Sequence, residues 1–217
     1  MKYKCVIFDL DGTLVNSLED LADSMNKVLI KKGYQIHDHE PYKYFIGNGI
    51  RNLVVQALPE FARTEEIISD CYGLMIKYYN ESCTVKTSLY EGIPELIKKL
   101  KEKNIKLAVL SNKAEELTKQ IINTLLSPSD FEIILGARPD LPSKPDTAGA
   151  LLICKELKIR PEDIIYLGDT KVDMITAKNA GMFPVGVLWG FRTKEELLEN
   201  GAKNIINNPL ELLSIID

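Results

Sequence analysis

The sequence predicts an α/β protein in which helices flank a parallel sheet. An all-helical cap is inserted into this core after the first strand. Two observations support this prediction. Short apolar runs end at polar or glycine-rich residues, and each is followed by a stretch with helical spacing. The first run is separated from the second by about ninety residues, far more than one crossover helix needs.

Six apolar runs are the expected strands. In chain order they are Val6–Leu10, Lys106–Leu110, Glu132–Leu135, Ile164–Leu167, Val185–Leu188 and Asn204–Ile206. Pro94 stands where the first turn of a helix tolerates proline, and we expect that helix to run to about Lys103. Because strands alternate with helices, the sheet is expected to be parallel and Rossmann-like.

The long interval after the first strand predicts the cap. Apolar residues recur at helical spacing after Ser17, the expected N-cap, and Gly49–Leu58 and Glu65–Tyr79 show the same periodicity. We expect the cap to span residues 16–85 and the core to comprise residues 1–15 and 86–217.

The composition indicates a folded, soluble protein. Of the 217 residues, 45% are apolar and 27% charged; the net charge is −4 with the basic residues scattered, so nucleic-acid binding is not expected. The four cysteines form no metal, redox or disulfide pattern and are expected to be reduced. No apolar run suits a secretory signal or a membrane span, so we expect a cytoplasmic protein without membrane contact. We also expect a monomer or a homodimer.

Polar side chains follow three of the expected strands. These residues are Asp9-Leu10-Asp11-Gly12-Thr13, Ser111-Asn112-Lys113 and Gly168-Asp169-Thr170 with Asp173 beyond, while Lys144-Pro145 precedes another helix. In open parallel sheets, ligands bind beyond the carboxyl ends of the strands. Buried carboxylates repel one another unless a cation or proton compensates, and oxygen ligands suit Mg²⁺. The acid cluster therefore predicts a magnesium site.

The same residues predict phosphoryl chemistry. Asp9 is the expected nucleophile, because carboxylates form aspartyl-phosphate intermediates. Asp11 is expected to protonate the leaving group and then to activate water. Ser111 and the backbone around Asn112 would hold phosphate oxygens, and Lys144 would neutralise their charge.

In chain order these residues resemble the four motifs of the haloacid dehalogenase superfamily. The chain is most similar to the phosphoglycolate phosphatase branch of that superfamily. The motifs are Asp9–Thr13, Leu110–Asn112, Lys144-Pro145 and Gly168–Thr170 with Asp173, and the resemblance covers nearly the whole chain. It implies that Asp9 and Asp169 bind Mg²⁺ by their side chains and Asp11 by its carbonyl. It also implies that Asp173 supports Lys144 and the fourth loop, that Gly12 and Thr13 help to bind phosphate, and that the cap closes during turnover.

One cap segment, Ile46–Arg51, resembles the IGxG segment that contacts substrate in phosphoglycolate phosphatases. Gly47, Asn48 and Arg51 are therefore candidate substrate contacts, with Arg51 suited to a carboxylate. The alternative is a glycine turn before a helix with Arg51 solvated. A dinucleotide fingerprint is disfavoured because Asn52 stands at the third glycine position.

Other candidates have simpler explanations. His37–Glu40 could bind a metal, but a solvated loop before Pro41 is the preferred interpretation. Core packing explains the aromatic residues at helical spacing in Tyr72–Tyr79 and those around the strand Val185–Leu188. Trp189-Gly190-Phe191 follows a strand end and could reach the rim of the site, although nothing in the sequence requires it.

We expect a phosphatase acting on a small phosphorylated metabolite, with phosphoglycolate as the leading substrate. The alternatives are a phosphotransferase resembling β-phosphoglucomutase, a pyrophosphatase or nucleotidase on the same scaffold, and a phospho-acceptor module resembling a response-regulator receiver. The cap and Asp11 argue against the receiver. Asn16, Thr147 and Lys171 depart from the usual pattern of the branch, which bears on the choice of subfamily and substrate.

Overall fold

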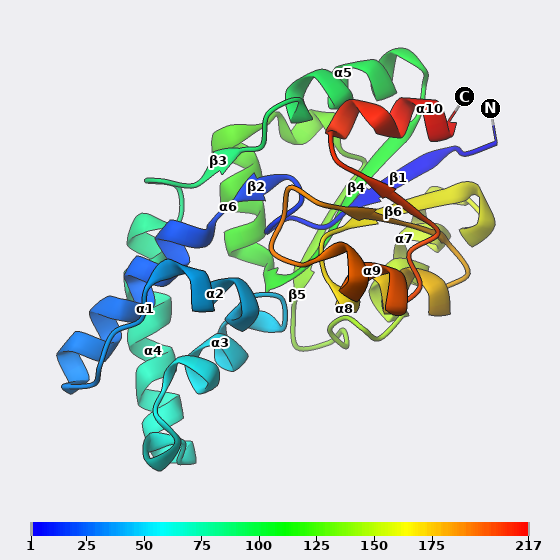
Figure 1. The fold of residues 1–217 in the computed structure, drawn as a ribbon. Coiled ribbons are helices and arrows are strands. Elements are labelled where there is room, and N and C mark those ends of the chain that lie inside the picture. The colour runs from blue at the N-terminus through cyan, green and yellow to red at the C-terminus, as the bar shows by residue number, and fades with distance from the viewer. Residues whose placement is uncertain (1, 217) are drawn as a thin grey trace.

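The computed structural model describes residues 2–216 and is built on a six-stranded parallel sheet (Figure 1). The strand order is β5-β4-β1-β6-β7-β8. The strands are β1 (Cys5–Phe8), β4 (Lys106–Ala114), β5 (Ile133–Ala137), β6 (Ile164–Gly168), β7 (Phe183–Val187) and β8 (Asn204–Ile206). All neighbouring pairs are parallel, so the carboxyl ends of the strands meet at one edge.

Helices cover both faces of this sheet, which explains why its central strands are apolar throughout. Val6 and Phe8 belong to the core on one face, and Cys5 and Ile7 to the core on the other. The first face is covered by α5 (Ile93–Glu102), α6 (Glu115–Leu125) and α10 (Leu212–Ile216), and the second by α7 (Ala148–Leu157) and α8 (Lys171–Asn179). The short helix α9 (Lys194–Glu199) packs beside β7 and α8.

A helical cap is inserted between β1 and β4, as predicted. The chain leaves the core through β2 (Val15–Asn16) and returns through β3 (Ser88–Leu89), and these two strands pair antiparallel. Between them lie α1 (Leu18–Lys32), α2 (His39–Phe45), α3 (Gly49–Ala57) and α4 (Glu65–Ser82), grouped to one side of the sheet (Figure 1). The boundaries at residues 16 and 85 stay a prediction.

Three local features differ from the expectations. Strand β4 continues beyond Leu110 to Ala114, with an irregular register against β5, so the polar residues 111–113 extend the strand. Helix α2 begins at His39 where a loop was expected, because Pro41 falls in its first turn, which tolerates proline. Ser17 occupies the N-cap position of α1, but its hydroxyl donates to Asp11 and caps no helical N–H.

Within residues 2–216, every helix falls short of the combined length and hydropathy that crossing a bilayer requires.

Candidate active site

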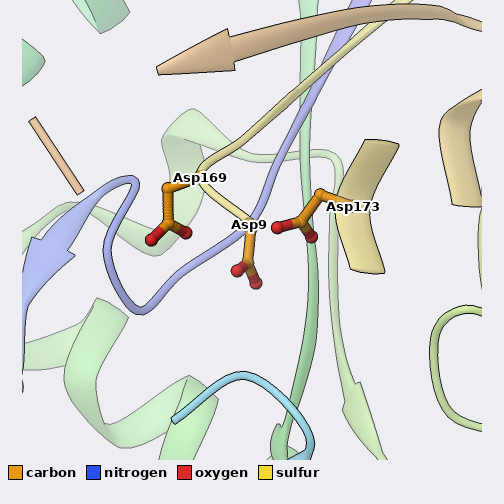
Figure 2. A group of neighbouring side chains, drawn as sticks. All are labelled: Asp9, Asp169 and Asp173. Carbon is orange, nitrogen blue, oxygen red and sulfur yellow. The ribbon is translucent and has the colours of Figure 1, made fainter. Parts of the chain in front are cut away.

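Three buried carboxylates meet at the carboxyl edge of the sheet (Figure 2). Asp9 follows β1, Asp169 follows the neighbouring strand β6, and Asp173 lies in the first turn of α8. One oxygen from each lies within 4.8 Å of the others. Adjacent parallel strands bring Asp9 and Asp169 together, as the sequence predicted.

Lys144 is the cation that faces this cluster. Its ammonium lies 2.9 Å from Asp9 Oδ1 and 2.6 Å from Asp173 Oδ1, and its side chain is 3% exposed. Burial lowers the pKa of Lys144, but Asp173 and Asp9 outweigh that effect and raise it well above the ordinary value. Lys144 is therefore a permanent cation here.

The charge of the cluster is suited to a divalent metal. Burial and the nearby Asp173 raise the pKa of Asp9 from 3.8 to about 7, against the opposing effect of Lys144. Burial, Asp173 and Asp9 raise the pKa of Asp169 well above its ordinary value. Three buried carboxylates crowd around one ammonium, an arrangement that a bound cation would relieve, and oxygen donors of this kind fit Mg²⁺. The donor set thus fits the ion that the sequence predicted.

The Asp169 carboxylate is held by two loops. Thr13 Oγ1 donates to Oδ1 at 3.3 Å, and the backbone N–H of Phe191 donates to Oδ2 at 2.8 Å. A Cβ at Gly12, whose φ is +84°, would come within 2.2 Å of Asp169 Oδ2, and one at Gly190 within 2.3 Å of Asp169 Cβ. Both glycines therefore let the backbone approach Asp169.

Sequence reasoning did not assign a role to the turn at Gly190 and Phe191. Trp189 Nε1 also donates to the Thr13 carbonyl, at 3.0 Å, so this turn packs against the first loop. The available signal was a glycine two residues after the expected strand Val185–Leu188, at the sheet edge where ligands bind. Thr13, a predicted phosphate contact, directs its hydroxyl to Asp169.

Asp173 divides its oxygens between two partners. Oδ2 accepts from the backbone N–H and the hydroxyl of Thr170, at 3.1 and 2.7 Å, forming a capping box at the start of α8. Oδ1 accepts from Lys144 at 2.6 Å. Asp173 therefore orders the loop that carries Asp169 and fixes Lys144 at the same time.

Asn112 links the core to the cap. Its Oδ1 accepts from the Lys144 N–H at 2.8 Å, and its Nδ2 donates to the carbonyls of Lys144 and Gly47, both at 3.0 Å. The Ser111 hydroxyl accepts from the Lys113 N–H at 3.2 Å. The side chain of Asn112 thus holds the lysine segment and the cap segment in place.

Lys113 is a second buried lysine at the site, to which sequence reasoning gave no role. Its ammonium lies 2.7 Å from Asp11 Oδ1 and 2.5 Å from the hydroxyl of Tyr79 on α4. Tyr79 was expected only to pack in the core, and it is indeed fully buried. The signal for Lys113 was its place at the end of a strand, beside Ser111 and Asn112.

A small pocket of about 30 Å³ lies between the core and the cap. The core supplies its polar side, and the cap supplies mostly apolar residues; the lining is Asp9, Asp11, Ser111, Asn112, Lys113, Leu21, Ile46, Gly47, Gly49, Ile50 and Leu53. Asn48 and Arg51 line a neighbouring groove, and Arg51 pairs with Glu65 on the cap. The contact of Arg51 with substrate stays a prediction.

Known proteins share both the sequence pattern and the fold. Residues 6–187 match the family of haloacid dehalogenase-like hydrolases. A phosphoglycolate phosphatase of Aquifex aeolicus is 31% identical, over 99% of this chain and 97% of its own, and one of Haemophilus influenzae is 30% identical over 99% of each. A solved structure from Haemophilus somnus, described as a predicted phosphoglycolate phosphatase, has a TM-score of 0.93 at 28% identity and covers 100% of this chain and 99% of that one.

Proposed function

Since the chain belongs to the haloacid dehalogenase-like hydrolase family and is a phosphoric monoester hydrolase, we propose that it works through a phosphoaspartate on Asp9 and requires Mg²⁺. Its substrate is a small phosphate monoester, with phosphoglycolate as the leading candidate. Relatives that are 30–31% identical are phosphoglycolate phosphatases, which supports this choice.

The position of Asp9 carries the proposal. It is a buried carboxylate at the end of the central strand, it lines a small pocket, and an ammonium lies 2.9 Å away. A nucleophilic carboxylate needs a nearby cation to receive a phosphoryl group, which brings further negative charge. Lys144 meets that need on one side of Asp9.

The metal would be held on the other side. Asp9 and Asp169 would bind Mg²⁺ through their side chains and Asp11 through its carbonyl, with Asp173 in support. When bound, the ion would offset the negative charge of the acids and of the phosphoryl group.

Two chemical steps follow from this arrangement. In the first, an oxygen of Asp9 bonds to phosphorus, the bond to the leaving group breaks, and the leaving oxygen takes a proton from Asp11. In the second, water attacks the phosphorus, Asp11 takes the proton of that water, and inorganic phosphate leaves Asp9. Lys144, Ser111 and the backbone of Asn112 hold the phosphate oxygens.

The first motif and the cap complete the proposed site. Gly12 and Thr13 bind phosphate through their loop, while Gly47, Asn48 and Arg51 contact the rest of the substrate. The apolar cap residues of the pocket exclude water while the phosphoenzyme forms. The small pocket favours a leaving group of a few atoms.

The test is phosphate release from a panel of esters with Mg²⁺ or with a chelator. The panel holds phosphoglycolate, sugar phosphates, nucleoside monophosphates and pyrophosphate, and the variants are Asp9→Asn and, as an exposed control, Asp38→Asn. We expect Mg²⁺-dependent release that Asp9→Asn abolishes and Asp38→Asn leaves intact. Acid quenching with labelled substrate should trap phosphate on the native chain.

Equal activity of native and Asp9→Asn protein would overturn the assigned nucleophile. A preference of at least a hundredfold for another ester would replace phosphoglycolate as the substrate. Transfer of the label to a sugar, without net release of phosphate, would identify a phosphotransferase.

A further inference from the structure

We propose that Lys113 of the core and Tyr79 of the cap together position the carboxylate of Asp11 for proton transfer to the leaving group. This inference rests on the proposed function, in which Asp11 is the acid and base. It adds two positioning residues to the site. It also means that the orientation of the Asp11 carboxylate depends on the position of the cap.

Lys113 is fixed from two directions. Its side chain is 2% exposed, and its ammonium donates to Asp11 Oδ1 at 2.7 Å and to the Tyr79 hydroxyl at 2.5 Å. The ammonium also lies 4.7 Å from the centroid of the Tyr79 ring. A buried ammonium is costly unless charged and polar partners surround it, so these contacts constrain it strongly.

Tyr79 brings the cap into this arrangement. It lies on α4, whereas Lys113 lies on β4 of the core, so their contact crosses between the two parts of the molecule. Burial, with a contribution from Asp11, raises the pKa of Tyr79 well above its ordinary value, so the hydroxyl keeps its proton. The position of α4 therefore determines where the ammonium of Lys113 lies.

Both hydrogen bonds to the Asp11 carboxylate fall on the same oxygen. Oδ1 accepts from Lys113 and also from the hydroxyl of Ser17, at 2.5 Å, just before α1 begins. An oxygen that already accepts two hydrogen bonds has little capacity for a further contact, so Oδ2 is the oxygen left to face the leaving group. Lys113 and Ser17 thereby orient the carboxylate and select its donor atom.

This role predicts a dependence on the leaving group. An alkyl ester such as phosphoglycolate releases an alkoxide that needs a proton, whereas p-nitrophenyl phosphate releases a phenolate that is stable without one. The parameter kcat/KM covers the steps up to phosphoenzyme formation, where that proton is used. Both esters are measured on one preparation, so partial misfolding lowers both values equally and leaves their ratio unchanged.

The variants are Lys113→Met, which keeps a long apolar side chain, and Tyr79→Phe, which keeps the ring and removes the hydroxyl. We expect Lys113→Met to lower kcat/KM for phosphoglycolate about tenfold more than for p-nitrophenyl phosphate, and Tyr79→Phe to change the ratio in the same direction by a smaller factor. Matched controls are Tyr78→Phe on the same helix and Lys98→Met at an exposed site, which should leave the ratio unchanged.

Equal losses for the two esters in both variants would overturn the inference, since a purely structural role predicts them, while the proposed function would stand. If the native enzyme hydrolyses neither p-nitrophenyl phosphate nor any ester of the panel, the proposed function fails and the inference falls with it. A changed ratio in Tyr78→Phe would also count against the specific role of the Tyr79 hydroxyl.

Discussion

At the residue scale, Asp9 lowers the stability of the metal-free fold as the pH rises. Its pKa is raised from 3.8 to about 7, by burial first and then by Asp173. Between these values the folded chain holds a proton that the unfolded chain has released, so the free energy of unfolding falls as the pH increases from about 4 to about 7. Above about pH 7 the folded chain has also released this proton, so the stability that protonated Asp9 provides is lost.

Asp9→Asn should therefore stabilise the metal-free protein at about pH 8, and by less at about pH 5, where Asp9 is already protonated. Guanidinium unfolding in the presence of a chelator measures the difference at each pH. Asp38→Asn, at an exposed acid, serves as the control and should show no such pattern. The same difference at both pH values would contradict the raised pKa of Asp9.

At the element scale, Asp20 ties the first helix of the cap to the returning chain. This carboxylate is 3% exposed and accepts from the N–H groups of Lys86 and Thr87 and from the Thr87 hydroxyl, at 2.7–3.1 Å. It thus joins the start of α1 to the segment that enters β3. These contacts hold together the two chain segments that join the cap to the core.

Removing this acceptor should destabilise the fold. Asp20→Ala leaves two backbone donors and one hydroxyl without their acceptor, and we expect the free energy of unfolding to fall by about 2–3 kcal/mol. Asp20→Asn keeps one acceptor oxygen and should cost less. Glu19→Ala, at the exposed neighbour that pairs with Lys86, should change stability by about 0.5 kcal/mol or less. Urea unfolding curves compare the three, and equal effects of Asp20→Ala and Glu19→Ala would contradict this role.

The elements differ in how well the sequence predicts them, for a physical reason. The strands of the sheet are buried on both faces, so they form continuous apolar runs that stand out from their surroundings. The continuation of β4 through residues 111–113 is polar because it enters the site, and so it resembles a loop. Helix α2 is only seven residues long and contains Pro41, so it is too short to show a clear helical periodicity.

The contacts of the site also differ in how well the sequence predicts them. Asp9, Asp169 and Asp173 could be predicted to meet, because neighbouring strand ends share one edge of the sheet. The contact between Lys113 and Tyr79 could not, because it depends on how α4 packs over the core. The sequence indicated that Trp189-Gly190-Phe191 could reach the rim of the site, but not that Gly190 leaves room for the Asp169 side chain, because that depends on how two loops pack.

At the scale of the whole molecule, Arg192 and Asn112 of the core hold one segment of the cap, residues 43–47. Arg192, which follows β7, donates to the carbonyls of Lys43, Tyr44 and Ile46 at the end of α2, the last at 2.9 Å. Asn112 donates to the next carbonyl, that of Gly47. A cation at the C-terminus of a helix is favourable, and this segment lines the pocket, so these contacts keep the pocket covered.

Arg192→Ala should therefore loosen this segment of the cap. Hydrogen bonds from a charged donor are worth about 1.5–3 kcal/mol, so we expect amide exchange in residues 43–47 to become about tenfold faster or more, with a higher KM for the substrate. Hydrogen–deuterium exchange measured by mass spectrometry tests this directly. Arg63→Ala is the matched control, because Arg63 binds the carbonyls of Gln56 and Leu58 within the cap. Unchanged exchange in Arg192→Ala would mean that the other cap contacts alone hold the segment, whereas faster exchange confined to residues 43–47 would identify Arg192 as the residue that holds it against the core.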